Sequence, residues 1–333
     1  MKKIVVLDSK VMGDFCFNRL NQYGNVEIYK STSNDELIER IKDAQIIINT
    51  QAVLNKKVLK HAEKLELICQ MTTGFNIIDI EYAREKGIAV TNVAGYSTHT
   101  VAQHSIALLL SLMNKIVIQD KFVKDGEFSK LNTFASPYNN PAQLFGKTVG
   151  IIGLGNIGRQ AAKVFDAFGA KVIYYSPSGN KQDVPYEMVS FEKLIKESDV
   201  ISIYASLNKK TEGLINYEVL KMMKKDALIV NVGRGPIIVE KDLARALNEN
   251  LIGGAALDVF TVEPIEAYNP LLHLDNPSKI VLTPHSAWLS AEAKETLFSG
   301  VLSNIDSFYS GGIENRIETP LDILIKEKNI LFA

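Results

Sequence analysis

Cysteine and tryptophan are scarce in this sequence, whose 333 residues include two cysteines and one tryptophan. Cys16 and Cys69 are too few for a disulfide framework, and they do not have the spacing of metal ligands. We expect each to be a small buried apolar residue in a reducing compartment. No metal site is therefore expected.

Long hydrophobic runs are also absent. The strongest run, residues 106–113, stops at Asn114 and Lys115, far short of the roughly 20 residues of a membrane span. Near the start of the chain, the apolar residues 4–7 end at Asp8, which is too short a run for the hydrophobic region of a signal peptide. The sequence therefore predicts a cytoplasmic protein that does not bind a membrane.

An excess of one charge is missing as well. The chain has 37 basic and 38 acidic residues, whereas proteins that bind nucleic acid or anionic membranes usually carry a basic excess. With 46 % hydrophobic and 23 % charged residues, the composition is that of a soluble globular protein, and the length favours two domains. We therefore expect a small molecule as partner, and no nucleic acid.

The most informative stretch that is present is residues 149–159, VGIIGLGNIGR, an apolar run that breaks into three glycines and continues at helical spacing. It predicts a strand, a tight turn and a helix. Gly153 permits the turn, Gly155 lets the backbone approach a pyrophosphate, and Gly158 allows close helix packing. Glycine-rich turns also occur where a chain only bends sharply, but a following strand at 171–175 completes a βαβ unit and favours dinucleotide binding.

The rest of the chain alternates in the same manner. Short apolar runs and stretches of helical spacing predict an open α/β unit in the first hundred residues, with strands at 3–7, 45–49, 65–71 and 88–92. After the glycine-rich unit, further runs predict a second doubly wound sheet, with strands at 200–204, 227–231, 254–257 and 279–282. The fold class is α/β, with two parallel-sheet domains and a ligand cleft between them.

Three other segments have distinct patterns. Residues 98–118 predict one long helix that includes His104, which we interpret as a packing histidine because no acidic neighbour accompanies it in the sequence. The polar residues 121–141 predict an irregular arm that contacts a second subunit. Residues 290–311 predict a final amphipathic helix capped by Ser290, as Asp79 caps an earlier one.

Three polar residues follow strands of the second sheet, at the edge where open α/β sheets bind ligands. Taken singly, Arg234 would be a surface arginine on a turn, Glu263 a loop carboxylate and His285 an ordinary histidine. Taken together, an arginine can pair with a substrate carboxylate, and a histidine oriented by a glutamate can deliver a proton. This set suits the reduction of a 2-keto acid by hydride from a nicotinamide.

The motifs in this chain resemble those of the D-isomer-specific 2-hydroxyacid dehydrogenases, most of all the glycerate dehydrogenase and hydroxypyruvate (glyoxylate) reductase branch. The similarity extends in the family's order over nearly the whole chain, through residues 73–79, 95–98, 101–104, 153–158, 231–235, 257–264 and 283–288. It implies Arg234, Glu263 and His285 as the catalytic set. It implies further substrate contacts at Thr73, Gly74, Tyr96 and Trp288, and cofactor contacts at Gly153, Gly155, Asn156, Ile157, Gly158, Ser176, Ala205, Val232, Gly233, Asp258 and His285.

The resemblance also implies a domain organisation in which one domain interrupts the other. A flavodoxin-like substrate domain would consist of residues 1–98 and 289–333, and a Rossmann-type NAD(P) domain would consist of residues 99–288. The family further implies a homodimer.

Three positions depart from the family pattern. Ser176 stands where NAD-preferring members have an aspartate that binds the ribose hydroxyls and repels a 2′-phosphate. Only Lys181 follows as a cation, so the sequence slightly favours NAD and leaves NADP open. Gln103 replaces a glutamate and Ser206 replaces a proline, and neither change removes a proposed catalytic group.

Two other functions share this fold. Dinucleotide-sensing corepressors resemble the family, but the complete Arg, Glu and His set and the lack of a basic patch favour an enzyme. Metal-free formate dehydrogenases pair the histidine with a glutamine, and Glu263 argues against that reaction because formate oxidation needs no proton transfer.

Overall fold

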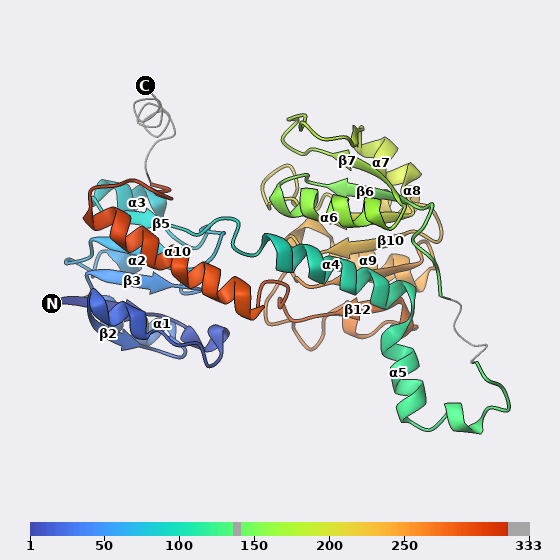
Figure 1. Cartoon of the computed structure of the whole chain (residues 1–333), viewed down its shortest axis with the longest axis horizontal. Helices are drawn as coiled ribbons and strands as arrows, with labels where there is room; N and C mark the ends of the chain where they lie inside the picture. Colours follow the sequence, from blue (N-terminus) through green and yellow to red (C-terminus); the bar gives the residue numbers. More distant parts are fainter. Residues whose placement is uncertain (136–140, 319–333) are drawn as a thin grey trace. The chain divides into compact units, whose positions relative to one another are not determined.

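The computed structural model describes residues 1–135 and 141–318. Part of the predicted arm (136–140) and the end of the predicted substrate domain (319–333) lie outside the described residues. The chain divides into two compact units, one formed by Met1–Ser97 with Leu289–Ala333 and the other by Thr98–Trp288. Each unit contains one parallel sheet (Figure 1).

The sheet of the first unit has five strands in the order β2-β1-β3-β4-β5, the flavodoxin-like order. The central strands are entirely buried, as expected for parallel strands that are covered on both faces. The sheet consists of β1 (Lys2–Val6), β2 (Gly24–Ile28), β3 (Ile46–Asn49), β4 (Leu67–Gln70) and β5 (Ala89–Thr91). The predicted fold class is confirmed for this unit.

The helices of the first unit are α1 (Asn34–Ile41), α2 (Lys56–Leu59), α3 (Ile80–Glu85) and α10 (Ala291–Tyr309), with 3-10 turns at Ser9–Met12 and Asn18–Gln22. Cys16 lies in the loop between these two turns and is exposed, so the expectation that it is buried is wrong, whereas Cys69 of β4 is buried as expected. Both predicted caps are confirmed, because Asp79 accepts from the Tyr82 amide and Ser290 from the Ala293 amide. Although α10 comes from the far end of the described chain, it packs against β4.

The sheet of the second unit has seven parallel strands in the order β12-β11-β10-β9-β6-β7-β8. This is the Rossmann order with one added strand, and its direction of winding reverses between β6 and β9. The strands are β6 (Thr148–Ile152), β7 (Lys171–Tyr175), β8 (Glu187–Met188), β9 (Val200–Ile203), β10 (Leu228–Asn231), β11 (Gly254–Leu257) and β12 (Ile280–Leu282). The predicted doubly wound sheet is confirmed.

Helices cover both faces of this second sheet. Leu109 of α4 and Phe165 of α6 belong to one buried cluster, whereas Leu194 of α7, Leu220 of α8 and Leu243 of α9 belong to the other. The helices are α4 (Thr98–Met113), α5 (Ile116–Lys124), α6 (Asn156–Ala167), α7 (Phe191–Glu197), α8 (Tyr217–Met222) and α9 (Glu240–Asn248). Short 3-10 turns lie at Phe128–Lys130, Gly235–Ile237, Pro270–Leu272 and Pro277–Lys279.

The prediction of one helix over residues 98–118 is wrong. Helix α4 ends at Met113, Lys115 adopts a left-handed backbone with φ 55°, and α5 starts at an angle of 60° to α4. The Asn114 side chain donates to the Leu110 carbonyl, and the Gln119 side chain donates to the Asn114 carbonyl. Such local bonds compete with helical ones and explain the break. Helix α5 also continues into residues 121–124, where an irregular arm was expected.

Two strands were not predicted at all. Strands β2 and β8 lie at the edges of their sheets and are only partly buried. Neither has the apolar run that identified the central strands. Within residues 1–135 and 141–318, no single helix is long and apolar enough to span a membrane, although the bent pair α4 and α5 meets those criteria jointly.

Candidate active site

The glycine-rich turn connects β6 to α6 at the point where the second sheet reverses its winding. Gly153 has φ 90°, and a Cβ there would lie 2.7 Å from the Ala205 backbone. A Cβ on Gly158 would lie 2.4 Å from the Gly153 carbonyl oxygen. These contacts confirm the predicted turn and the predicted close helix packing. A Cβ on Gly155 would meet nothing within 4 Å, so the backbone at the start of α6 faces open space, as approach of a pyrophosphate requires.

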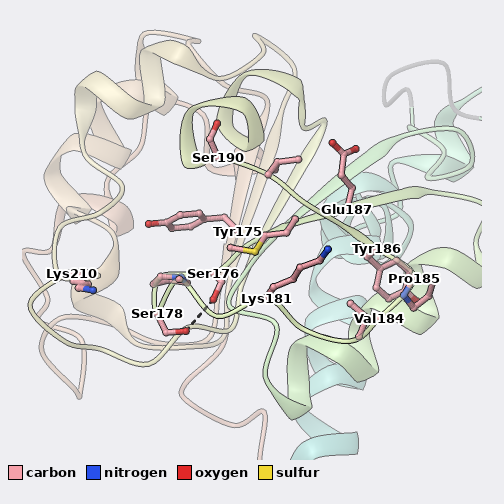
Figure 2. Close-up of a pocket in the computed structure, with 14 residues that line it drawn as sticks. Tyr175, Ser176, Ser178, Lys181, Val184, Pro185, Tyr186, Glu187, Ser190 and Lys210 are labelled. Carbon is pink, nitrogen blue, oxygen red and sulfur yellow. Dashed lines mark hydrogen bonds between the residues drawn. The ribbon is translucent and has the colours of Figure 1, made fainter.

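A cavity of about 820 Å³ lies beyond the end of β7 (Figure 2). The Ser176 and Ser178 hydroxyls lie 3.1 Å apart in it, and Lys181 and Lys210 also line it. The carboxylate of Glu187, another lining residue, forms an ion pair with Lys193 at 2.8 Å. Residues 176–181 include no acid. The cavity therefore presents hydroxyls and cations at the position where a Rossmann fold binds the adenosine ribose.

The loop that contains Arg234 is held from inside by Asn231, the last residue of β10. The Asn231 amide oxygen accepts from the Gly233 backbone at 3.0 Å, and its amide nitrogen donates to the Arg234 carbonyl at 2.9 Å. A Cβ on Gly235 would overlap the Phe260 carbonyl carbon at 1.9 Å, so the loops after β10 and β11 are in contact. Ala205 and Val232 are buried nearby in the same unit. Sequence reasoning did not identify Asn231 as the residue that shapes this loop.

His285 and Glu263 form the hydrogen-bonded pair expected of a proton donor. The His285 Nδ1 lies 2.6 Å from Glu263 Oε2, and the other carboxylate oxygen accepts from the Phe260 amide at 2.9 Å. Burial alone would raise the pKa of Glu263, but these two hydrogen bonds and the nearby charge of Arg234 hold the pKa below its usual value. The bond assigns the Nδ1 proton to the Glu263 contact and leaves Nε2 for other chemistry.

Asp258 lies directly after β11 and is 1 % exposed. Its carboxylate accepts from the Thr283 hydroxyl at 2.6 Å, the Ser286 amide at 2.9 Å and the Ala287 amide at 3.0 Å. Burial favours the neutral acid, but hydrogen bonds from His104, Thr283 and the two amides lower the pKa of Asp258. The structure therefore holds a buried carboxylate beside the loop that contains His285.

His104, which we interpreted as a packing histidine without an acidic neighbour in the sequence, lies close to an acidic residue in space. Its Nε2 lies 3.0 Å from Thr283 Oγ1 and 3.4 Å from Asp258 Oδ1. This contact was not predictable from the sequence, because it arises only when α4 packs across β11 and β12.

The other predicted substrate residues divide between the two units. Thr73 and Gly74 follow β4 in the first unit, where the Thr73 carbonyl accepts from the Asn92 side chain at 2.7 Å. The backbone amides of Thr73 and Gly74 donate to no residue in the described parts of the chain. Tyr96, which follows β5, belongs to the first unit and is partly buried. Trp288 packs against the α4 and α6 cluster of the second unit.

Comparison with known proteins decides the family. The model of the D-isomer specific 2-hydroxyacid dehydrogenase NAD binding domain matches residues 106–287. The chain belongs to the D-isomer-specific 2-hydroxyacid dehydrogenase family. It is 34 % identical over 322 residues to the hydroxypyruvate reductase of Blautia hydrogenotrophica, covering 94 % of this chain and 98 % of that protein. It is also 34 % identical to the glycerate dehydrogenase of Methylorubrum extorquens, covering 95 % and 99 % of the two chains.

The chain is also similar to a solved structure over nearly its whole length. The acyclic imino acid reductase Bsp5, in complex with NADPH and D-Arg, has a TM-score of 0.84 and 31 % identity, and the match covers 95 % of this chain and all (100 %) of that one. This 2-hydroxyacid dehydrogenase is therefore an NAD(P)-dependent oxidoreductase with two parallel-sheet α/β domains, and it acts on small hydroxy or keto acids. The names of these relatives favour an enzymatic function over that of a dinucleotide-sensing binding protein.

Proposed function

We propose that this enzyme reduces a small 2-keto acid to the D-2-hydroxy acid and that His285 donates the proton. The His285–Glu263 hydrogen bond carries this proposal, because it fixes the imidazole tautomer and stabilises the imidazolium. When bound, the nicotinamide cofactor supplies the hydride. The names of the two sequence relatives support hydroxypyruvate as a leading substrate, and glyoxylate is the next candidate.

Each proposed residue has a separate task. The Nε2 proton of His285 goes to the developing alkoxide, and Glu263 balances the charge of the imidazolium before transfer. Arg234 pairs with the substrate carboxylate, with help from the amides of Thr73 and Gly74. Those amides are suited to this task because they have no acceptor in the described chain. Tyr96 and Trp288 line the substrate pocket in this proposal.

The second unit fits a dinucleotide in two places. The open start of α6 suits the pyrophosphate, with contacts from Gly155, Asn156 and Ile157. The cavity after β7 suits the adenosine ribose beside Ser176. Ala205, Val232, Gly233 and Asp258 complete the proposed contacts toward the nicotinamide end. We keep NAD as the slightly favoured cofactor, while the hydroxyls and lysines of the cavity leave room for NADP.

Two further properties belong to the proposal. We expect a homodimer, because no residue of α5 is buried and its apolar side chains Ile116, Val117 and Val123 are exposed. We expect a cytoplasmic location, since the two cysteines are unpaired. Formate oxidation is less well supported than keto-acid reduction, because the histidine is paired with a carboxylate that suits proton transfer.

The direct test follows cofactor oxidation with hydroxypyruvate at about 340 nm, the absorption band of the reduced nicotinamide. We expect His285→Ala to lower turnover by about 10²–10⁴-fold if the imidazole is the general acid. Cofactor binding, measured by fluorescence, should be largely retained. His273→Ala, at a histidine bonded to the Ala267 carbonyl rather than to Glu263, is the matched control. Full activity of His285→Ala would remove the proposed role.

A further inference from the structure

We propose that His104 is a positioning residue for the reaction, and this inference rests on the proposed role of His285. His104 holds the Thr283 hydroxyl, Thr283 bonds the buried Asp258 carboxylate, and Asp258 holds the loop that presents His285. His104 itself lies on α4 and makes no hydrogen bond to His285, Glu263 or Arg234 within residues 1–135 and 141–318. Its effect on the reaction is therefore indirect.

The number of protons available determines which atom donates in each hydrogen bond of this network. A threonine hydroxyl has one proton to donate, and at 2.6 Å the proton of Thr283 goes to Asp258 Oδ1, whose ionised carboxylate can only accept. The Thr283 oxygen must then accept in its contact with His104, so the His104 Nε2 is the donor at 3.0 Å. His104 thus holds the hydroxyl oxygen in place and keeps its proton directed at Asp258.

Asp258 in turn fixes the chain on both sides of His285. Its carboxylate bonds Thr283 two residues before His285, and it bonds the amides of Ser286 and Ala287 directly after. The Asp258 backbone carbonyl accepts from the His285 amide at 2.8 Å. His285 has φ 52°, a left-handed conformation that residues other than glycine adopt only when their surroundings hold them. The Asp258 network supplies those surroundings.

The electrostatics of Asp258 support the same view. No lysine or arginine of the described chain forms an ion pair with this buried carboxylate, whereas the His104 Nε2 lies 3.4 Å from Asp258 Oδ1. The His104 side chain is 25 % exposed, so it connects the carboxylate to a partly solvated edge of α4. The His104 Nε2 faces both Thr283 and Asp258, and packing alone does not require this orientation of the ring.

A pair of variants separates positioning from packing. His104→Leu removes the donor and keeps an apolar side chain, whereas His104→Gln keeps an N–H donor at a similar distance from the backbone. We expect His104→Leu to lower kcat with hydroxypyruvate by at least about tenfold, with KM changed less than kcat. We expect His104→Gln to recover most of the loss. Thr283→Val should resemble His104→Leu, and the double variant should be little worse than either single one, because both remove the same connection.

A second measurement does not depend on turnover. The chain has five histidines, so their imidazole proton NMR signals can be assigned by single substitutions. In the holoenzyme, the His285 signal should shift or broaden in His104→Leu and return toward its wild-type position in His104→Gln. If wild-type protein shows no reductase activity, the proposed function fails and this NMR comparison still tests the positioning role. A His285 signal that does not move in His104→Leu would overturn the inference. Equal losses of kcat in His104→Leu and His104→Gln, accompanied by a lower Tm in both, would also overturn it.

Discussion

Replacing Glu263 by glutamine isolates the contribution of one carboxylate to proton donation by His285. The substitution preserves side-chain shape and a hydrogen-bond acceptor for Nδ1, but it removes the negative charge that faces the imidazolium. A hydrogen bond to a charged group contributes about 1.5–3 kcal/mol. Since the two side chains are 39 % and 34 % exposed, solvent screening reduces this to about 1–2 kcal/mol.

That energy predicts two measurable changes in Glu263→Gln. At neutral pH, kcat/KM for keto-acid reduction should fall by about 5–30-fold. The pKa of Glu263 is held below its usual value, so the carboxylate that pairs with His285 is charged at neutral pH and becomes protonated when the pH falls through its pKa. The difference in kcat/KM between the wild type and Glu263→Gln should therefore be fully present at neutral pH and shrink at acidic pH.

The assay is a pH series of initial rates for wild-type and Glu263→Gln enzymes, at subsaturating hydroxypyruvate and saturating cofactor. Glu266→Gln is a matched control, because Glu266 lies on the same loop and bonds Tyr268 rather than His285. A ratio of wild-type to Glu263→Gln rates that stayed constant down to acidic pH would refute the reasoning, even if the rate at neutral pH fell. Such a result would mean that Glu263 acts only through loop structure.

Three other predictions follow from the same structure. Arg234→Ala should mainly abolish productive binding of the keto acid, and unchanged KM and kcat in steady-state assays would refute the carboxylate clamp. Ser176→Asp should lower use of NADPH relative to NADH, because the new carboxylate in the cavity of Figure 2 would repel a 2′-phosphate; an unchanged ratio of kcat/KM values would exclude Ser176 from cofactor choice. The pKa of Asp258 is lower in the folded protein than its value of about 3.9 in the unfolded chain, so the ionised carboxylate stabilises the fold above that pH. This stabilisation is lost as the pH falls through the pKa of Asp258 in the folded protein. The unfolding free energies of the wild type and Asp258→Asn, measured with urea over a pH series, should therefore become equal at acidic pH. A difference that stays constant with pH would contradict this.

Local patterns were sufficient to predict much of the fold. The β6–α6 turn was predictable because the glycines that it requires, Gly153 for the tight turn and Gly158 for close helix packing, lie within a few residues of one another. Parallel central strands were predictable because burial on both faces demands apolar runs. The edge strands β2 and β8 have no such requirement. The break between α4 and α5 depends on side-chain bonds of Asn114 and Gln119, which a pattern of apolar spacing does not show.

The residues of the candidate site were predictable from the sequence, but their long-range contacts were not. Arg234, Glu263 and His285 were identified by residue type and by their place after strands, and the structure brings Glu263 and His285 into hydrogen-bond contact. Their catalytic roles, and the substrate contacts at Thr73, Gly74, Tyr96 and Trp288, stay predictions. The contacts of His104 with Thr283 and Asp258 required tertiary packing of α4 on the sheet, and Lys210 enters the β7 cavity from a loop far along the chain. Single-sequence patterns do not carry such long-range contacts.

The stereochemistry of the product is the most decisive test of whether this enzyme is a D-specific reductase. The purified enzyme would be incubated with hydroxypyruvate and NADH, and separately with NADPH, and the glycerate formed would be resolved on a chiral column. We predict that D-glycerate alone is formed, in step with oxidation of the preferred cofactor. Formation of L-glycerate, or tight cofactor binding with no turnover of hydroxypyruvate, glyoxylate or pyruvate, would contradict it.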